Sequence, residues 1–326
     1  MLLDEIKEII STETLPFGEI YQQVENYKKD SKDYLAPLSQ LRLNNHASLT
    51  DTTHKLQDFN LTDWSSTQLA NKLGIPSSYL KKCIRNGQIK LAQDNVNTWI
   101  INSDKSSLLR TYKDNLIGIV SDRYSIMDNT HLLDCLQDSL NLDSYNIKGS
   151  ITSPERLHLR LVEKELLDIP NEDLFAGLLI NNSNVGRSCL TVRFIIFKQV
   201  CTNGLVLPQE SSILFKQKHM GIKVEDFREC LQTNLKLIPK LVNEATKMIK
   251  STINHSLNKD DLGNLIEKIK KDTSLSDEHL DTIVNMLDFY GYNTWGVING
   301  LTQVSRDFTL EKRLELEKYA GSMLIA

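Results

Sequence analysis

The sequence predicts an α+β fold, in which an antiparallel-rich β-core follows a small helical module and precedes a region of long helices. From about residue 97 to residue 207, apolar and polar residues alternate and β-branched residues accumulate. A pattern of two short helices comes before this stretch, and after Pro208 the apolar residues recur at helical spacing. The 326 residues, 40% hydrophobic and 25% charged, suffice for two compact units of a globular protein.

Residues 1–60 are predicted to form a variable N-terminal arm, because a short amphipathic opening is followed by a polar stretch with weak periodicity. Residues 61–96 are predicted to form a small helix-turn-helix-like module. Thr62-Asp63 can cap its first helix, residues 74–76 (Gly-Ile-Pro) end that helix, and Ser77 or Ser78 can cap the second.

The helix-turn-helix-like module is basic. Residues 61–90 contain five basic side chains and one acidic side chain. We interpret the module in two ways: as a reader of duplex DNA, or as a packing module with a solvated basic face. The second helix contains a second basic patch, which consists of Lys81, Lys82 and Arg85.

Residues 97–207 are predicted to form the α+β core. A helix is expected at residues 129–140, with Asp128 or Asn129 as its cap and leucines along one face. The expected strands are residues 97–101, 108–112, 116–121, 145–152, 156–162, 175–181 and 189–197.

Residues 208–326 are predicted to be helical, with helices at 224–255, 260–271, 277–290 and from 294 to about 324. The overall net charge of −4 conceals an uneven distribution. Residues 176–224 have a net charge of +5, whereas residues 258–290 have a net charge of −4. This asymmetry indicates a basic β-core beside an acidic helical region, and therefore a local site for a polyanion.

A strip of cations is predicted on the β-core. Period two in residues 156–161 directs the leucines inward and Arg156, His158 and Arg160 outward. The same period in residues 190–194 directs Arg193 outward. The strip is either a solvated exterior or a binding surface for phosphates, whose oxygens match guanidinium groups in pairs.

Further candidates lie near these strands. Tyr124 follows a strand and could stack on a base while Arg123 contacts phosphate, or it could pack in a structural turn. Gly186-Arg187 is typical of a hairpin turn and, less often, of a phosphate loop. The complete set of candidate nucleic-acid-binding residues is Arg110, Lys113, Arg123, Tyr124, Arg156, His158, Arg160, Arg187, Arg193 and Lys198.

No enzyme motif is present in the sequence: it lacks a GxSxG, an HExxH and a GxxxxGK[ST]. Cys201 is the strongest candidate nucleophile, because the turn expected at Asn203-Gly204 could expose it, but no basic partner for its thiol is identifiable, so a structural cysteine is favoured. We therefore expect no catalytic residue, no metal and no cofactor. The acidic N-terminus and the absence of a long apolar run favour a cytoplasmic protein with reduced thiols.

Three stretches resemble the characteristic segments of a phage- and plasmid-associated family, the domain of unknown function 932. They are residues 115–129 (NLIGIVSDRYSIMDN), 198–205 (KQVCTNGL) and 293–302 (NTWGVINGLT). Residues 61–85 are similar to the N-terminal part of longer members, so the resemblance covers about residues 60–324. It implies a role on phages or plasmids of a bacterial host. The order of strands and helices also resembles that of single-strand annealing proteins, which form rings and hold single-stranded DNA in a basic groove.

The expected function is that of a non-enzymatic single-stranded DNA-binding protein, which anneals strands in phage or plasmid recombination or replication and forms a homo-oligomer. One alternative is a regulator that binds duplex DNA through residues 61–90. Another is a protein that counters a host defence factor and docks through the acidic helical region. A recombination protein is a further expected partner, and no membrane is expected.

Overall fold

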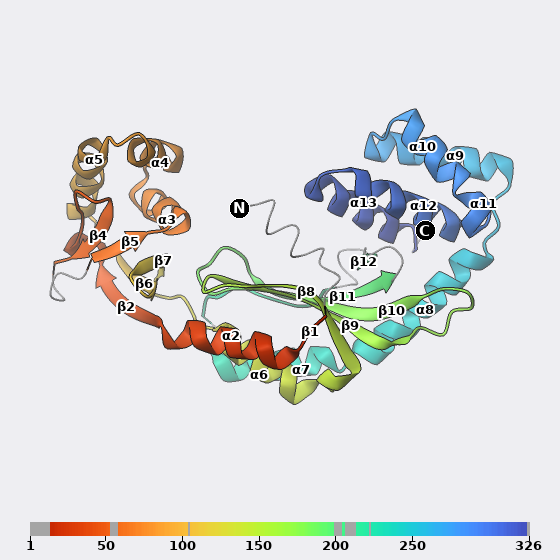
Figure 1. The fold of residues 1–326 in the computed structure, drawn as a ribbon, viewed down its shortest axis with the longest axis horizontal. Coiled ribbons are helices and arrows are strands. Elements are labelled where there is room, and N and C mark those ends of the chain that lie inside the picture. Colours follow the sequence, from red (N-terminus) through yellow and green to blue (C-terminus); the bar gives the residue numbers. More distant parts are fainter. Residues whose placement is uncertain are drawn as a thin grey trace.

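Two β-sheets form the frame of the protein, and helices cover one face of each (Figure 1). The computed structural model describes residues 14–52, 58–103, 105–198, 204–205, 213–221 and 223–324. Strands and helices both make up large parts of it, and most strand pairs are antiparallel, which confirms the predicted α+β class. None of the described helices is long and apolar enough to cross a membrane.

The N-terminal sheet has six strands, and α3 and α5 cover one of its faces. Leu69 of α3, Val96 of α5 and Leu109 of the sheet are fully buried in its core. Residues 31–121 are called the N-terminal lobe below. In sheet order, the strands are β2 (Ser31–Pro37), β6 (Ser106–Tyr112), β7 (Asn115–Ser121), β5 (Asp58–Leu61), β4 (Ser48–Asp51) and β3 (Leu41–Leu43), and the helices are η1 (Leu38–Gln40), α3 (Asp63–Leu73), α4 (Ser77–Arg85) and α5 (Ile89–Ile101).

The central sheet is built around four long antiparallel strands. Leu159 of β9, Ile180 of β10 and Val192 of β11 alternate with polar residues and point into the main core, where leucines of α6 and α7 cover them. The strands are β1 (Thr14–Leu15), β8 (Tyr145–Thr152), β9 (Arg156–Leu166), β10 (Leu174–Ser183), β11 (Leu190–Lys198), β12 (Gly204–Leu205) and β13 (Ile213–Gln217), which pairs with β11. The covering helices are α2 (Phe17–Lys29), α6 (Asn129–Ser139), η2 (Leu142–Ser144) and α7 (Val224–Leu235).

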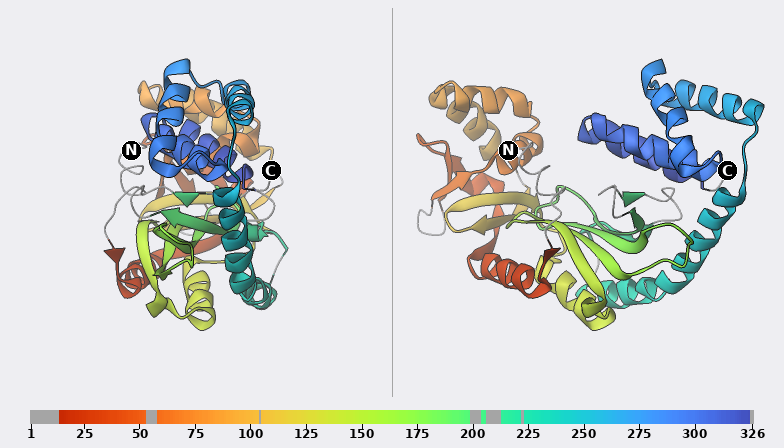
Figure 2. Two further views of the ribbon diagram at one scale, coloured as in Figure 1. Left: turned by 90° about the vertical axis from the view of Figure 1, so that its right-hand side faces the viewer. Right: turned by 45° about the vertical axis from the view of Figure 1, so that its right-hand side comes forward.

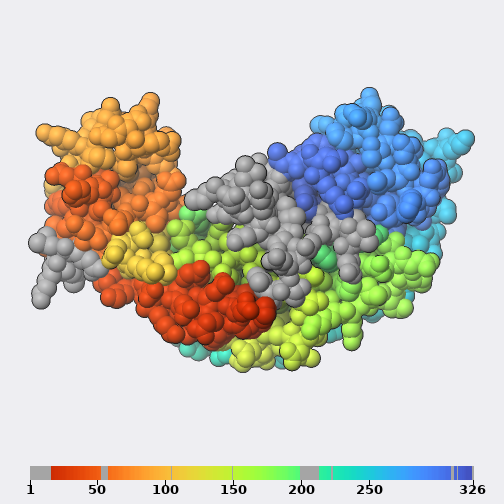
Figure 3. Space-filling view, viewed as in Figure 1, coloured from red at the N-terminus to blue at the C-terminus, as the bar shows by residue number. Residues whose placement is uncertain are grey.

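The C-terminal helices rise from the far end of the central sheet and turn back above it (Figures 1 and 2). Residues 259–322 are called the C-terminal lobe. Both lobes lie on the same side of the central sheet, and in the space-filling view their described atoms stand apart above it (Figures 2 and 3). The helices are α8 (Ile238–Asn254), α9 (Lys259–Thr273), α10 (Asp277–Asn285), α11 (Leu287–Tyr290), α12 (Thr294–Val304), η4 (Ser305–Asp307) and α13 (Leu310–Ser322).

The turn between β10 and β11 joins the central sheet to the N-terminal lobe. A Cβ atom on Gly118 of β7 would lie 2.9 Å from the Cβ of Val185, so only glycine permits this approach. The carbonyl of Val185 accepts hydrogen bonds from Trp64 Nε1 at 3.0 Å and from Gln68 Nε2 at 2.9 Å, both on α3. Gln68 Oε1 in turn accepts from the backbone N–H of Ile119 at 2.8 Å. Sheet, helix and turn are therefore joined in one hydrogen-bonded unit.

Four expectations about secondary structure are wrong. The helices expected at 224–255, 277–290 and 294 to about 324 are each interrupted. Residues 97–101 were expected to be a strand but form the last turns of α5, because Val96 and Ile100 face the N-terminal sheet at helical spacing. The described part of residues 1–60 is not an arm but supplies α2 and four strands of the N-terminal sheet. Strands also continue beyond Pro208, because β13 pairs with β11 in the central sheet.

The helix caps are partly as expected. Thr62 caps α3 and forms a reciprocal capping box with Ser65. The residue before α4 is Pro76, and no side chain of Ser77 or Ser78 caps that helix. Asp128 is the cap residue of α6, but its carboxylate makes no capping hydrogen bond.

Candidate nucleic-acid interface

The predicted strip of cations lies on one face of the central sheet. Leu179 of β10 is paired with Arg160 of β9 on one side and with Arg193 of β11 on the other. Directly paired residues point to the same face, so the two arginines flank Leu179 at a spacing of about 10 Å, twice the distance between strands. Arg156 and His158 share this face because they are separated from Arg160 by even numbers of residues. We call Arg156, His158, Arg160 and Arg193 the cationic face.

A second row of polar residues crosses the same face. His158 is paired with Asn181, Asn181 with Thr191, and Thr191 with Lys216 of β13. Lys216 is exposed and was not predicted, because β13 was not recognised as a strand. Residues 213–217 (ILFKQ) do not alternate, since three apolar residues are followed by two polar ones, so period two gives no indication of this strand.

His158 is a neutral member of the cationic face. Its Nδ1 lies 2.5 Å from Oδ1 of Asn181, and among the described residues Nε2 has no hydrogen-bond partner. Burial lowers the pKa of His158 to about 4, and the charges of Arg160 and Arg156 act in the same direction. The ring is therefore uncharged at neutral pH, and the positive charge of this face comes from its arginines and from Lys216.

Helix α13 approaches the cationic face at Arg160. Glu317 of α13 is 4% exposed and accepts a hydrogen bond from Arg313 Nε at 3.0 Å. Burial raises the pKa of Glu317, while the nearby charges of Arg313 and Arg160 oppose that rise. Glu317 thus places a carboxyl group, paired with Arg313, among the cations at this edge of the face.

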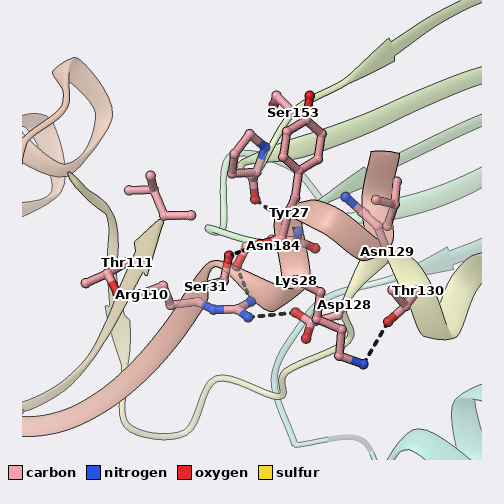
Figure 4. A pocket seen from close by; sticks show the side chains of 13 residues that line it. Tyr27, Lys28, Ser31, Arg110, Thr111, Asp128, Asn129, Thr130, Ser153 and Asn184 are labelled. Carbon is pink, nitrogen blue, oxygen red and sulfur yellow. Dashed lines mark hydrogen bonds and ion pairs between the residues drawn. The ribbon is translucent and has the colours of Figure 1, made fainter. Parts of the chain in front are cut away.

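Arg110 has a structural role. Its side chain is 4% exposed and is held between two carboxylates, Asp33 at 2.8 Å and Asp128 at 2.6 Å. It also donates to the carbonyl oxygen of Asn184 at 2.7 Å (Figure 4). The expectation that Arg110 contacts a nucleic acid is contradicted, because its donors are occupied in linking β2, α6 and the β10–β11 turn. The carboxylate of Asp128 binds Arg110, which explains why it does not cap α6.

Tyr124 is also engaged inside the protein. Its hydroxyl donates to the carbonyl of Ser183 at 2.8 Å, and its ring is stacked on that of His219, with centroids 5.1 Å apart. The structural interpretation of Tyr124 therefore fits, and its ring is not presented to a base. Arg123 beside it is exposed, as is Lys113 in the β6–β7 turn. The cationic face contains neither of these two.

Arg187 occupies the β10–β11 turn, which Gly186 permits with a φ of 74°. Its guanidinium forms an ion pair with Glu155 at 2.6 Å and lies 4.9 Å from the ring centroid of Trp64. This turn is a hairpin connection, as predicted, and not a phosphate loop, because Arg187 is paired with Glu155.

Lys198, at the end of β11, lies in a largely buried cluster of side chains. Its Nζ contacts Glu172 at 2.7 Å and Oδ1 of Asn299 at 2.8 Å. Trp295 donates from Nε1 to the other oxygen of Glu172 at 2.6 Å, and the Lys198 ammonium lies 4.7 Å from the ring centroid of Tyr290. Because all these partners belong to the protein, Lys198 ties the central sheet to α12 and is not presented to a ligand. The expectation that it binds nucleic acid is therefore not supported by its placement.

The second basic patch lies on α4 of the N-terminal lobe, apart from the cationic face. Lys82 and Arg85 are exposed, whereas Lys81 lies 3.8 Å from Asp63 of α3. The left-handed backbone of Gly74 turns the chain between α3 and α4, as in a helix-turn-helix.

A model of a known protein family matches more than half of the chain. The model of the domain of unknown function DUF932 matches residues 116–304. The chain belongs to this family. The DUF932 match begins in β7 and ends with α12, so it includes the cationic strands β9 to β11 and leaves out most of the N-terminal lobe. No curated protein and no solved structure matches the chain.

Two of the stretches that resemble DUF932 segments meet in the Lys198 cluster. Lys198 belongs to the stretch 198–205, and Trp295 and Asn299 belong to the stretch 293–302. Trp295 is 3% exposed and packs in the main core. Cys201 lies outside the described residues. Within the part of the chain that the structure describes, no group of three His, Cys, Asp or Glu residues is placed to hold a metal ion.

Proposed function

We propose that this DUF932 protein binds single-stranded DNA through the cationic face and acts without catalysing a reaction. The observation that supports the proposal is the strand register, which aligns Arg156, Arg160 and Arg193 on the side of the sheet opposite the main core. Guanidinium groups on neighbouring strands are suited to successive phosphates, because each can donate two parallel hydrogen bonds.

The chemistry of the face favours contacts to the DNA backbone. Its two described rows contain arginine, histidine, asparagine, threonine, leucine, isoleucine and lysine, and no phenylalanine, tyrosine or tryptophan; the pair Phe175 and Phe197 lies on the same face four residues further along β10 and β11. Bases bound by single-strand binders are usually stacked on aromatic rings. A strand held here by its phosphates would keep its bases free to pair, which is what annealing requires. We place this activity in phage or plasmid recombination or replication, in the cytoplasm of a bacterial host.

The test is a salt titration of binding to a labelled single-stranded oligonucleotide. Affinity should fall with salt at a log–log slope of about −0.7 for each phosphate neutralised. Replacing Arg156 and Arg193 by glutamine should make the slope shallower by about 1.4. The matched control replaces Lys113 and Arg123 by glutamine, which removes the same charge from exposed positions off the face.

Two results would contradict the proposal. One is a flat salt response of the wild-type protein. The other is an equal loss of binding in the control variant, because a general loss of charge and not the face would then explain the binding. Mixed and pyrimidine-only strands should bind within about tenfold of each other, since the proposed contacts do not read base edges.

A second candidate function is supported by the α3–α4 pair, whose turn and exposed Lys82 and Arg85 suit duplex DNA. The variant with Lys81, Lys82 and Arg85 replaced by alanine distinguishes the two. If the proposed function is correct, this variant retains most of its binding to single-stranded DNA. If it melts normally and loses all DNA binding, or if the wild-type protein strongly prefers one duplex sequence, the duplex-binding function is favoured.

A further inference from the structure

The two ends of the molecule have opposite charge. Residues 77–92, in α4 and the start of α5, contain four basic side chains and no acidic one: Lys81, Lys82, Arg85 and Lys90. Residues 277–292, in α10, α11 and the turn after them, contain four acidic side chains and no lysine or arginine: Asp277, Glu278, Asp281 and Asp288. We call these segments the basic end and the acidic end.

The basic end also exposes large apolar side chains. Leu91 is 45% and Trp99 is 56% exposed, and with Asn95 between them they form a stripe of every fourth residue along α5. Tyr79 of α4 is 39% exposed, and its hydroxyl lies 3.2 Å from Asn95 Nδ2 in the middle of the stripe. The opposite face of α5 packs on the N-terminal sheet through Val96. The stripe is therefore turned away from the core of its own lobe.

The acidic end has a matching pair of exposed aromatic rings. Phe289 is 91% exposed, which is exceptional for a phenylalanine, and Tyr292 is 53% exposed. The Tyr292 hydroxyl donates to Asp288 at 2.7 Å, which sets a carboxylate beside the aromatic pair. Asp281 is also exposed, two turns before Phe289 along the same helical run.

The two ends cannot meet within one chain. Helices α4 and α5 lie at one extreme of the longest axis and α10 and α11 at the other (Figures 1 and 2). Opposite charges attract, and exposed aromatic rings are the side chains that contribute most to protein interfaces. The chain thus contains both halves of a complementary contact, placed so that only two different copies can join them.

We propose that the partner of each end is a second copy of this chain, and that the acidic end of one protomer docks on the basic end of the next. Phe289 and Tyr292 of one copy would pack against Trp99 and Leu91 of the other, with the charged residues around them. Such a contact uses different surfaces on the two protomers, so it leaves one free end on each side and can repeat. It does not depend on the proposed function, since it forms without nucleic acid.

The experiment is sedimentation velocity of nucleic-acid-free protein over a range of concentrations, at low and at high salt. The wild-type protein should form species larger than a dimer as its concentration rises, and salt should weaken them. Trp99→Asp and Phe289→Asp should each weaken the association about tenfold or more. Leu237→Asp is the matched control, because Leu237 is 47% exposed at the turn between α7 and α8, and it should assemble as the wild type does.

Mixing the two variants gives the decisive result. The Trp99→Asp protein keeps an intact acidic end, and the Phe289→Asp protein keeps an intact basic end. An equimolar mixture should therefore form a one-to-one dimer and nothing larger. Charge reversal provides a second test that leaves the aromatic rings in place. Arg85→Glu should weaken assembly, and mixing it with Asp281→Arg should restore species larger than a dimer, because the two reversed ends attract each other and the two intact ends still pair.

Three results would overturn the proposal. They are a wild-type protein that remains monomeric at all concentrations, an assembly that persists unchanged in both aspartate variants, and a mixture that stays monomeric. If the basic end instead binds duplex DNA while the protein remains monomeric, its partner is a nucleic acid and not a second copy. Failure of single-strand binding would leave these sedimentation results unaffected, so the two proposals can fail separately.

Discussion

His219 should make the protein sensitive to mild acid. The side chain is 4% exposed, and burial lowers its pKa from 6.5 to about 4. The ring is stacked on Tyr124, and a hydrogen bond to the backbone of Ser125 opposes only part of the lowering of the pKa. The unfolded chain regains a histidine pKa near 6.5, so between about pH 6.5 and pH 4 the unfolded state binds the proton more readily than the folded state.

The sign and size of the effect follow from this difference. The contribution of neutral His219 to the free energy of unfolding is fully present above about pH 6.5 and is lost as the pH falls toward about 4. The free energy of unfolding should decrease by about 2 kcal/mol by pH 5 and by about 3 kcal/mol below pH 4 through this group alone. His219→Phe keeps a stacked aromatic ring and removes the titrating group, so this part of the pH dependence should disappear.

The assay is urea unfolding followed by circular dichroism at pH 7.5 and at pH 5. Between the two pH values, the free energy of unfolding of His219→Phe should fall by about 2 kcal/mol less than that of the wild type. His46→Phe is the control, because His46 is exposed and its ring is hydrated in both folded and unfolded states. His158 is present in every protein compared, so its contribution to the pH dependence cancels. Equal losses for the wild type and His219→Phe would refute the reasoning.

Three further predictions concern packing. Trp295→Ala should lower the free energy of unfolding by about 3–5 kcal/mol, measured by denaturant titration, because it empties a buried site. Lys198→Met should cost about 3–5 kcal/mol in the same assay because it leaves Glu172 without its cation, and Lys198→Met combined with Glu172→Gln should recover part of that loss. Gly177→Ala should lower the melting temperature, because the added Cβ would lie 2.5 Å from the carbonyl oxygen of Leu161 on β9; an unchanged melting temperature would contradict the close approach of these strands.

Local periodicity was sufficient to predict the four long strands of the central sheet and the cationic face on them. The strand predicted at residues 145–152 coincides with β8, and those at 156–162 and 175–181 lie within β9 and β10. Arg160 and Arg193 were placed on one face by period two alone, and the register puts them on either side of the same residue. Such predictions succeed because alternation records which side of a strand is buried.

Features that depend on contacts between residues far apart in the sequence could not be predicted. The short strands β3, β4 and β5 have three or four residues each and are held by their neighbours in the sheet. Arg110 has the local pattern of a surface cation, but Asp33 and Asp128 bury it from positions far away in the sequence. The last turns of α5 were mistaken for a strand because β-branched and aromatic residues are frequent there, whereas contacts to the N-terminal sheet fixed the helix.

The junction at Val185 has a mechanical consequence. Its carbonyl is bound by two side chains of α3, and its side chain fills the space over Gly118, so the N-terminal lobe cannot tilt without breaking these contacts together. On the other side of the central sheet, the path to the C-terminal lobe runs through α8 and a short connection at residues 255–258. The C-terminal lobe is also fastened directly to the sheet, because Lys198 of β11 contacts Asn299 of α12 and shares Glu172 with Trp295. A change in the separation of the two lobes therefore requires the contacts of one of these two junctions to break.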